Sequence, residues 1–409
     1  MTSWSTIGAI VVLLGIVLAS PAIVFIGAAV LVIRVLAEVW PRRVLDQLEY
    51  RRSVSPDRTI AGDEVELRMT LWNRTRSPLA WASATDTLSE GLMARTLSGS
   101  EVGGFGQDVL RVSGALRPYE QVTRRFKVTP LRRGVHELGP ARVRVAELFG
   151  THAPLRDPEL EPLTILARPR TAPVTGAVPA NAPLARRRAP RSLFADPHLF
   201  AGVRPFQPGD PLKSVHWRAS ARRPSLQTKR FEPSLSGQVV LVFDVQTIEG
   251  EYWMLVYDDI AFEALATATL SIARELVTAE TAVGFAAAAF SGTTSRYVHL
   301  PARADRPQLS RLGDALARLS PESSAPLANL LSWLPRRLAS GSMIVVLSAR
   351  DATQSRNIVR SLERSGYPVH FLLHGPQTLA SEARRAGMSA WSLRVDTEGG
   401  VPRAVAIAA

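Results

Sequence analysis

The first long apolar pattern of the chain lies at its N-terminus, where residues 7–33 contain no charged side chain over 27 positions. As one helix this stretch would be about 40 Å long, whereas about 20 apolar residues are enough to cross the core of a bilayer. Ser20-Pro21 divides the stretch, so it fits either one kinked span or two short helices that turn at the proline. We expect residues 1–40 to form a membrane segment.

Residues 41–168 follow a different pattern, in which apolar and polar side chains alternate. The alternation is clear in residues 64–71, 121–128 and 141–145, which Gly and Pro residues separate, and it is typical of half-buried strands. About seven short strands of this kind predict an all-β, immunoglobulin-like sandwich. The glycine-rich stretch 91–106 lacks the Gly-Lys-Ser/Thr ending of a phosphate loop, so no nucleotide site is predicted there.

The remainder of the chain divides into a linker, a short motif segment and an α/β domain. Residues 169–195 carry five prolines around three consecutive arginines and predict a linker, and residues 196–235 form the motif segment. In residues 236–409, continuous apolar runs alternate with helical patterns, which predicts a doubly wound parallel sheet. Ligands of such sheets bind at the carboxyl ends of the strands, which is where Asp244 and Ser348 fall.

Charge changes this picture in two places. The net charge is +13, and residues 183–231 hold eleven Arg or Lys side chains against two Asp, a local excess of +9. A second group of arginines follows the N-terminal apolar run: Arg34, Arg42, Arg43, Arg51 and Arg52. The positive-inside rule keeps these in the cytoplasm together with the large C-terminal body. The chain has no cysteine, which excludes disulfides, thiolate nucleophiles and Cys-based metal sites.

The motif segment contains a dense mixture of turn-forming, aromatic and basic residues from 200 to 222. Pro208-Gly209 has the order of a type II turn. Asp210 can accept N–H bonds at a helix N-terminus, and Pro211 suits the first helical position. We expect a short helix that runs from there to about Trp217.

This segment resembles the signature of a bacterial family called domain of unknown function 58. The matching positions that we take as candidate binding residues are Arg204, Phe206, Pro208, Gly209, Asp210, Lys213, His216, Trp217, Ser220 and Arg222. The resemblance extends to Asp244 and to the order of the predicted parts. It implies a transmembrane helical hairpin, the β domain, the motif and a von Willebrand A-like α/β domain, but the family has no established activity.

The resemblance also implies a class of partner, because members of this family look like companions of MoxR-type AAA+ ATPases. We therefore expect a non-enzymatic, membrane-anchored scaffold or adaptor that assists assembly or maturation of envelope-related complexes. It would lie in the cell membrane with its soluble domains in the cytoplasm. Arg204, Lys213 and Arg222 would bind acidic groups of the partner, while Phe206 and Trp217 would hold the motif against the sheet.

The resemblance to von Willebrand A domains raises the possibility of a divalent ion at Asp244. Those domains bind the ion through Asp-x-Ser-x-Ser after the first strand and through a later Asp, because hard cations need oxygen ligands. Here Gln246 and Ile248 replace the serines, Ser348 stands where the second Asp is expected, and Asp351 lies beyond that position. We expect a degenerate site and no metal or other cofactor.

Two alternatives remain for the motif. A hydrolase could use Asp210, His216 and Ser220, but these fall within eleven residues, and no Gly-x-Ser-x-Gly elbow is present. Nucleic acid or anionic lipid could bind the basic side chains of the same segment. We expect neither an enzyme nor a nucleic-acid-binding protein.

Overall fold

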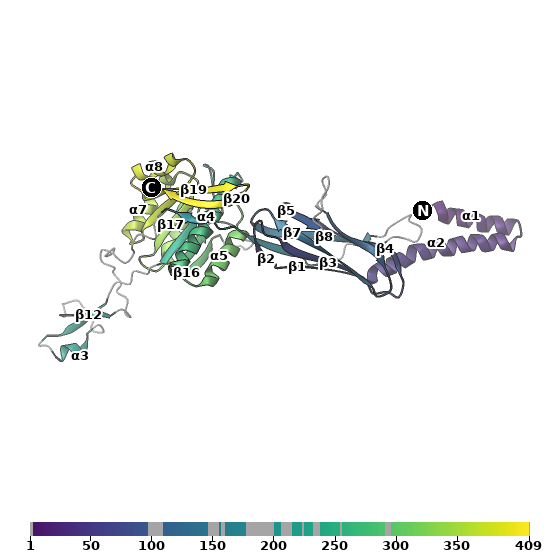
Figure 1. Ribbon diagram of the computed structural model, residues 1–409, viewed down its shortest axis with the longest axis horizontal. Helices are drawn as coiled ribbons and strands as arrows, with labels where there is room; N and C mark the ends of the chain where they lie inside the picture. Colours follow the sequence, from purple (N-terminus) through teal and green to yellow (C-terminus); the bar gives the residue numbers. More distant parts are fainter. Residues whose placement is uncertain are drawn as a thin grey trace. The chain divides into compact units, whose positions relative to one another are not determined.

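The structure is a computed structural model that describes residues 3–96, 109–145, 155–156, 160–176, 200–205, 215–222, 225–231, 238–253, 256–290 and 296–408. The chain divides into two compact units, Met1–Arg168 and Pro169–Ala409 (Figure 1). Each unit has its own hydrophobic core.

The first unit begins with two paired helices, α1 (Ser3–Val17) and α2 (Pro21–Gln47) (Figure 1). Ala19 turns the chain with φ of 48°, and Pro21 begins α2, where a missing N–H costs nothing. The helices approach closely at two glycines. A Cβ on Gly15 would lie 2.6 Å from the Val24 nitrogen, and one on Gly27 would lie 2.7 Å from the Val12 nitrogen.

These helices correct the prediction for the N-terminus. In the part of the chain that the structure describes, no helix is long and apolar enough to cross a membrane. The turn cuts the uncharged run into α1, with 15 residues, and residues 21–33 of α2, after which charged side chains begin at Arg34. Each piece is shorter than the roughly 20 residues that a span requires. The predicted transmembrane hairpin is therefore wrong.

The rest of the first unit is a β-sandwich of two sheets. One sheet has the order β1-β3-β7-β5, formed by Leu48–Ser55, Val65–Asn73, Gln121–Pro130 and Leu92–Thr96. The other has the order β2-β10-β8-β4-β6, formed by Arg58–Ile60, Leu163–Arg168, Gly134–Val145, Leu79–Leu88 and Val109–Leu116, and β9 (Leu155–Arg156) pairs with β8. Both sheets contribute to a single core, because alternate side chains such as Leu67, Met69 and Leu71 point inward.

A buried ion pair lies within this sandwich. Tyr50 Oη donates to Asp86 Oδ2 over 2.6 Å, and Arg52 pairs with Asp86 Oδ1. Arg52 Nη2 also donates to the carbonyl oxygen of Glu161 over 3.0 Å. Burial raises the pKa of Asp86, while the bonds from Tyr50 and Arg52 oppose that rise.

The second unit is built on an eight-stranded sheet with the order β11-β20-β19-β18-β17-β14-β15-β16. In that order the strands are Val174–Thr175, Val401–Ala408, Ala390–Glu398, Val369–His374, Met343–Ser348, Gln238–Phe243, Ala282–Ala287 and Val298–Arg303. The strands from β19 to β15 are parallel to one another, whereas β20 and β16 pair antiparallel with their inner neighbours.

Helices cover both faces of this sheet. Val239, Leu241 and Phe243 of β14 belong to one core, and the intervening Val240 and Val242 belong to the other. The first core includes side chains of α4 (Asp259–Thr278) and α5 (Arg306–Arg318). The second includes side chains of α6 (Leu327–Trp333), α7 (Arg356–Arg364) and α8 (Gln377–Arg385). Burial on both faces explains why these strands are continuously apolar in sequence.

The motif segment contributes a separate small sheet. Its strands β12 (Phe200–Pro205) and β13 (Gln227–Phe231) pair antiparallel, and a one-turn helix, α3 (Trp217–Ser220), lies between them in the sequence.

Candidate functional site

The carboxyl edge of the α/β sheet holds a cluster of three buried polar side chains. Asp244 directly follows β14, and Ser348 is the last residue of the adjacent strand β17. Phe243 pairs with Leu347 in the parallel register, so the next residues, Asp244 and Ser348, lie side by side. Ser348 Oγ donates to Asp244 Oδ2 over 2.7 Å. Arg350 Nη2 donates to both carboxylate oxygens of Asp244, at 3.1 Å and 3.3 Å. The exposed fractions of the three residues are only 4%, 2% and 9%.

Burial and the neighbouring side chains act on Asp244 in opposite directions. Burial raises the pKa of Asp244, and the opposing influences are the Arg350 charge and the bonds from Ser348, Arg350 and the Gln246 backbone. Arg350 thus places a cationic guanidinium against the carboxylate. The cluster is also tied to the backbone, since Ser348 Oγ accepts from the Arg350 N–H over 3.1 Å.

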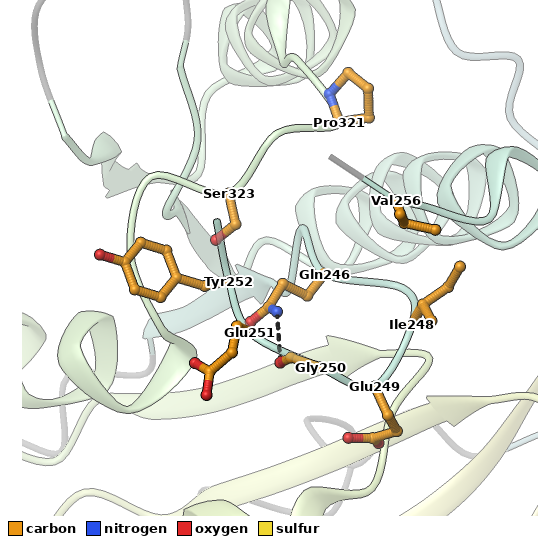
Figure 2. Close-up of a pocket in the computed structure, with 9 residues that line it drawn as sticks. All are labelled: Gln246, Ile248, Glu249, Gly250, Glu251, Tyr252, Val256, Pro321 and Ser323. Atoms are coloured by element: carbon orange, nitrogen blue, oxygen red, sulfur yellow. Dashed lines mark hydrogen bonds between the residues drawn. The ribbon is translucent and has the colours of Figure 1, made fainter. Parts of the chain in front are cut away.

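The residues around Asp244 do not fit a divalent-ion site. Within the described ranges, no group of three or more His, Cys, Asp or Glu side chains could hold a metal ion. Gln246 Nε2 donates to the Gly250 carbonyl over 3.3 Å (Figure 2), and the neighbouring Ile248 has no oxygen to offer. Asp351 serves as a helix cap, where its Oδ1 accepts from the Thr353 N–H over 2.9 Å. The single carboxylate that remains is already paired with an arginine.

The loop after β14 is braced beside the cluster. Glu249 accepts from the Asp351 N–H over 2.7 Å and from Gln354 Nε2 over 3.1 Å, which joins this loop to the segment after β17. A small pocket lies next to the brace, as Figure 2 shows. It is lined by Gln246, Ile248, Glu249, Gly250, Glu251, Tyr252, Val256, Pro321 and Ser323.

Only some of the predicted motif residues lie in the described part of the chain. Phe206, Pro208, Gly209, Asp210 and Lys213 lie outside the described residues. Arg204 lies in β12 opposite Thr228, with only its backbone described. The structure does describe four side chains of the motif, those of His216, Trp217, Ser220 and Arg222.

His216 and Ser220 have structural contacts within the motif. His216 is the N-cap of α3, and its Nδ1 accepts from the Ala219 N–H over 3.1 Å. Ser220 Oγ accepts from the Gln227 N–H over 2.8 Å and donates to the His216 carbonyl, not to its ring, over 3.1 Å. These bonds join the helix to β13, together with the bridge between Val215 and Thr228.

The described helix of this segment is α3, which begins at Trp217 with His216 as its N-cap. The helix predicted from Asp210 to about Trp217 lies almost wholly outside the described residues. Trp217, which we expect to hold the motif against the sheet, is 68% exposed. Arg222 is also exposed, as a partner-binding side chain must be.

Sequence reasoning missed Arg350, the partner of Asp244. A signal was present, since a basic residue follows two positions after the strand that ends at Ser348. It could be interpreted only with the register of β14 and β17, which brings residues more than 100 positions apart into contact.

The fold and the site together define a protein that combines a β-sandwich with a doubly wound α/β sheet whose carboxyl edge carries a neutralised Asp–Arg pair. Residues 202–366 match the family described as "Protein of unknown function DUF58". The family resemblance predicted from the motif is confirmed over these residues.

A curated relative supports the same assignment. "Uncharacterized protein YeaD" of Bacillus subtilis (strain 168) is 24% identical over 239 residues, which make up 56% of this chain and 52% of the relative. The match therefore spans about half the length of the curated relative. Neither the family description nor the relative's name gives an activity.

Several solved structures are similar to about a third of the chain or less. A type II cohesin domain from the cellulosome of Acetivibrio cellulolyticus has a TM-score of 0.23 and 10% identity, covering 29% of this chain and 95% of that one. The CARDB domain of the PF1109 protein from Pyrococcus furiosus has a TM-score of 0.18 and 12% identity, covering 29% and 93%. Likenesses at this level carry no argument about function. The comparisons give no support to the expected von Willebrand A likeness.

Proposed function

We propose that this protein is a non-enzymatic scaffold or adaptor that binds a protein partner, and that the partner is a MoxR-type AAA+ ATPase. The partner class comes from the family resemblance, as does the proposed role in assembly or maturation of envelope-related complexes. The observation that supports a binding role is the pairing of Asp244 with Arg350. In doubly wound sheets the carboxyl edge is where ligands bind, and here its carboxylate is neutralised by the protein itself.

The Arg350 guanidinium changes how the carboxyl edge of the sheet can bind a partner, because it occupies the carboxylate of Asp244. A bound divalent ion with an open coordination position can accept a carboxylate from another protein, whereas a paired and buried arginine offers no such position. Recognition would then depend on surface side chains. Arg222 is exposed in the motif segment, as is Trp217, and Arg and Trp are the residue types enriched at the energetic centres of protein interfaces.

The same contacts weigh against the hydrolase alternative. A catalytic serine needs a base that can accept its proton, and Ser220 Oγ instead donates to a backbone carbonyl. The Nδ1 atom of His216 accepts a backbone N–H, which leaves the ring oriented as a helix cap. We therefore propose structural roles for both residues.

The test is capture of the tagged full chain from its own cells, with identification of the proteins that co-purify. We expect a AAA+ ATPase to be enriched with the unaltered protein and to be lost with Arg204→Ala and Arg222→Ala. Arg124→Ala, at an exposed position of the β-sandwich, is the matched control and should retain the ATPase. Absence of any ATPase with the unaltered chain would contradict the proposal, and enrichment of nucleic acid instead would favour the alternative.

A further inference from the structure

A group of large apolar side chains is exposed around the carboxyl edge of the α/β sheet. We call it the edge patch, and it consists of Ile248 (40% exposed), Trp253 (62%), Val256 (65%), Tyr257 (43%), Ile260 (82%) and Phe290 (48%). All but one belong to the loop between β14 and α4 or to the first turn of α4, and Phe290 follows β15. Isolated exposed apolar side chains are ordinary, but six around one edge of a sheet mark a candidate interaction surface.

Contacts within the unit connect four residues of the edge patch, Ile248, Trp253, Val256 and Phe290, with one small pocket. Ile248 and Val256 line the same pocket, and Pro321 lines it as well (Figure 2). The rings of Tyr252 and Trp253 lie 5.1 Å apart, and Tyr252 also lines that pocket. The Ser320 N–H, next to Pro321, donates to the Phe290 carbonyl over 3.1 Å, which brings Phe290 to the same surface.

The loop that carries the edge patch is held in place by polar contacts beneath it. The Asp258 N–H donates to Thr247 Oγ1 over 2.7 Å, which closes the loop at its base. Asp258 Oδ1 then caps α4 by accepting from Ile260 N–H at 2.9 Å and Ala261 N–H at 3.1 Å. Glu249 braces the other end against the segment after β17. A surface fixed in this way loses little conformational entropy when a partner binds.

The loop that carries most of the edge patch is acidic, in a chain whose net charge is +13. Residues 232–273 contain no Lys or Arg at all. The acidic side chains in and around the loop are Glu249, Glu251, Asp258, Asp259 and Glu263. This combination of apolar centre and acidic border is opposite in sign to the rest of the chain, and it repels phosphate groups and anionic lipid head groups.

We propose that the edge patch binds a basic polypeptide segment of a partner protein, one that carries an aromatic or aliphatic anchor flanked by Lys or Arg. The anchor contacts the exposed rings and aliphatic groups, and the flanking cations face the acidic border. This inference rests on the proposed adaptor function and adds the chemistry of the segment that is recognised. It places that contact at the sheet edge, separate from the basic motif.

The test uses the purified full chain and two synthetic amphipathic peptides with the same Leu and Trp positions, one with Lys at every polar position and the other with Glu. Fluorescence anisotropy of labelled peptide measures binding. We expect the lysine peptide to bind at least about tenfold more tightly than the glutamate peptide, and its affinity to fall as salt is raised. Equal binding of the two peptides, or no binding of either, would overturn the proposal.

Matched variants locate the contact. Trp253→Ser and Ile260→Ser should each weaken the lysine peptide about tenfold or more, whereas Trp81→Ser, at a partly exposed position of the β-sandwich, should leave binding unchanged. Glu251→Lys should weaken it less, and Glu90→Lys is the control for that charge change. Because these positions are exposed, a thermal melt should show each variant folded. Equal losses in the patch and control variants would contradict the assignment.

The basic motif segment of a second copy of the chain could also bind the edge patch. Analytical ultracentrifugation distinguishes this self-association from binding of a partner protein. Self-association that depends on concentration and disappears with Trp253→Ser would assign the edge patch to copies of this chain and overturn the partner assignment. The peptide result needs no ATPase, so a failed ATPase capture with successful peptide binding would remove only the proposed partner class. The reverse outcome would remove only the edge patch.

Discussion

Two buried aspartates, one in each unit of the molecule, have nearly the same partners and different surroundings. Asp86 in the β-sandwich is bound by Tyr50 and Arg52, and its side chain is fully buried. It lies within strand β4, in the sheet that forms half of a closed sandwich. Nothing in its position offers access to a ligand, so we regard this cluster as part of the framework of the fold.

Asp244 in the α/β sheet is bound by Ser348 and Arg350 in an equivalent way. It lies just after the end of a parallel strand, beneath a braced loop that exposes apolar side chains. The chemistry of a polar cluster therefore does not identify a site by itself. Its place in the fold does, and here the place that ligands use in such sheets carries a framework cluster with an interaction surface around it.

The largest effect that can test this comparison is loss of the arginine in the sandwich. Arg52→Met should lower the free energy of unfolding by about 3–5 kcal/mol, because it leaves a buried carboxylate without its charge partner. Urea unfolding of the full chain measures the change. Arg124→Met, exposed in the same unit, should cost less than about 0.5 kcal/mol. If the two variants were equally stable, the framework role of Asp86 would be wrong.

The equivalent change in the α/β unit should have a somewhat smaller effect. Arg350→Met should cost about 2–4 kcal/mol, since the side chains of Arg350 and Asp244 are 10% and 5% exposed, against 6% and 0% for Arg52 and Asp86. Hydrogen exchange of the β14 and β17 amides should report the loss locally. The double variant Asp244→Asn, Arg350→Met should recover part of it. A double variant as unstable as the sum of the single changes would contradict the pairing.

Removal of the hydroxyl donors should have a smaller effect that is similar in both units. Tyr50→Phe and Ser348→Ala each delete one hydrogen bond to a buried carboxylate, which is worth about 1.5–3 kcal/mol. Urea unfolding of the two variants under the same conditions gives the comparison. A neutral result at one aspartate alone would show that the two clusters are not equivalent.

The smallest expected effect is the pH dependence of stability that His374 causes in the α/β unit. Burial lowers the pKa of His374 below its ordinary 6.5, although a hydrogen bond to the Leu393 backbone and the charge of Asp258 oppose this. The unfolded chain then binds more protons than the folded one at pH values just below 6.5. The contribution of His374 to the free energy of unfolding should therefore be fully present above pH 6.5. It should be lost as the pH falls from 6.5 through the pKa of His374 in the folded chain. Melting curves should show a shallower fall for His374→Gln, and an identical slope would contradict the assignment.

Much of the sheet structure could be predicted from the sequence because it depends on local periodicity. The alternation in residues 64–71 coincides with β3, and the continuous run 239–243 coincides with β14. The position of Asp244 after that strand follows from the same pattern. These features need no knowledge of distant contacts.

The errors arose where the outcome depends on more than local pattern. An uncharged run of 27 residues suggested a membrane segment, but the turn at Ala19 divides it into helical pieces that are too short. The cap of α3 by His216 was not predicted, because it depends on the bridge that pairs Val215 with the distant Thr228. The pairing of Arg350 with Asp244 required the order of strands in the sheet.

The most direct test of the central claim is the thermal unfolding of the full chain with and without millimolar Mg²⁺, Ca²⁺ or Mn²⁺. If Arg350 neutralises Asp244 in place of a metal ion, none of these cations should raise the melting temperature, and Asp244→Asn should not change that insensitivity. A rise in melting temperature that depends on the cation concentration and disappears in Asp244→Asn would show that the carboxylate binds an ion after all.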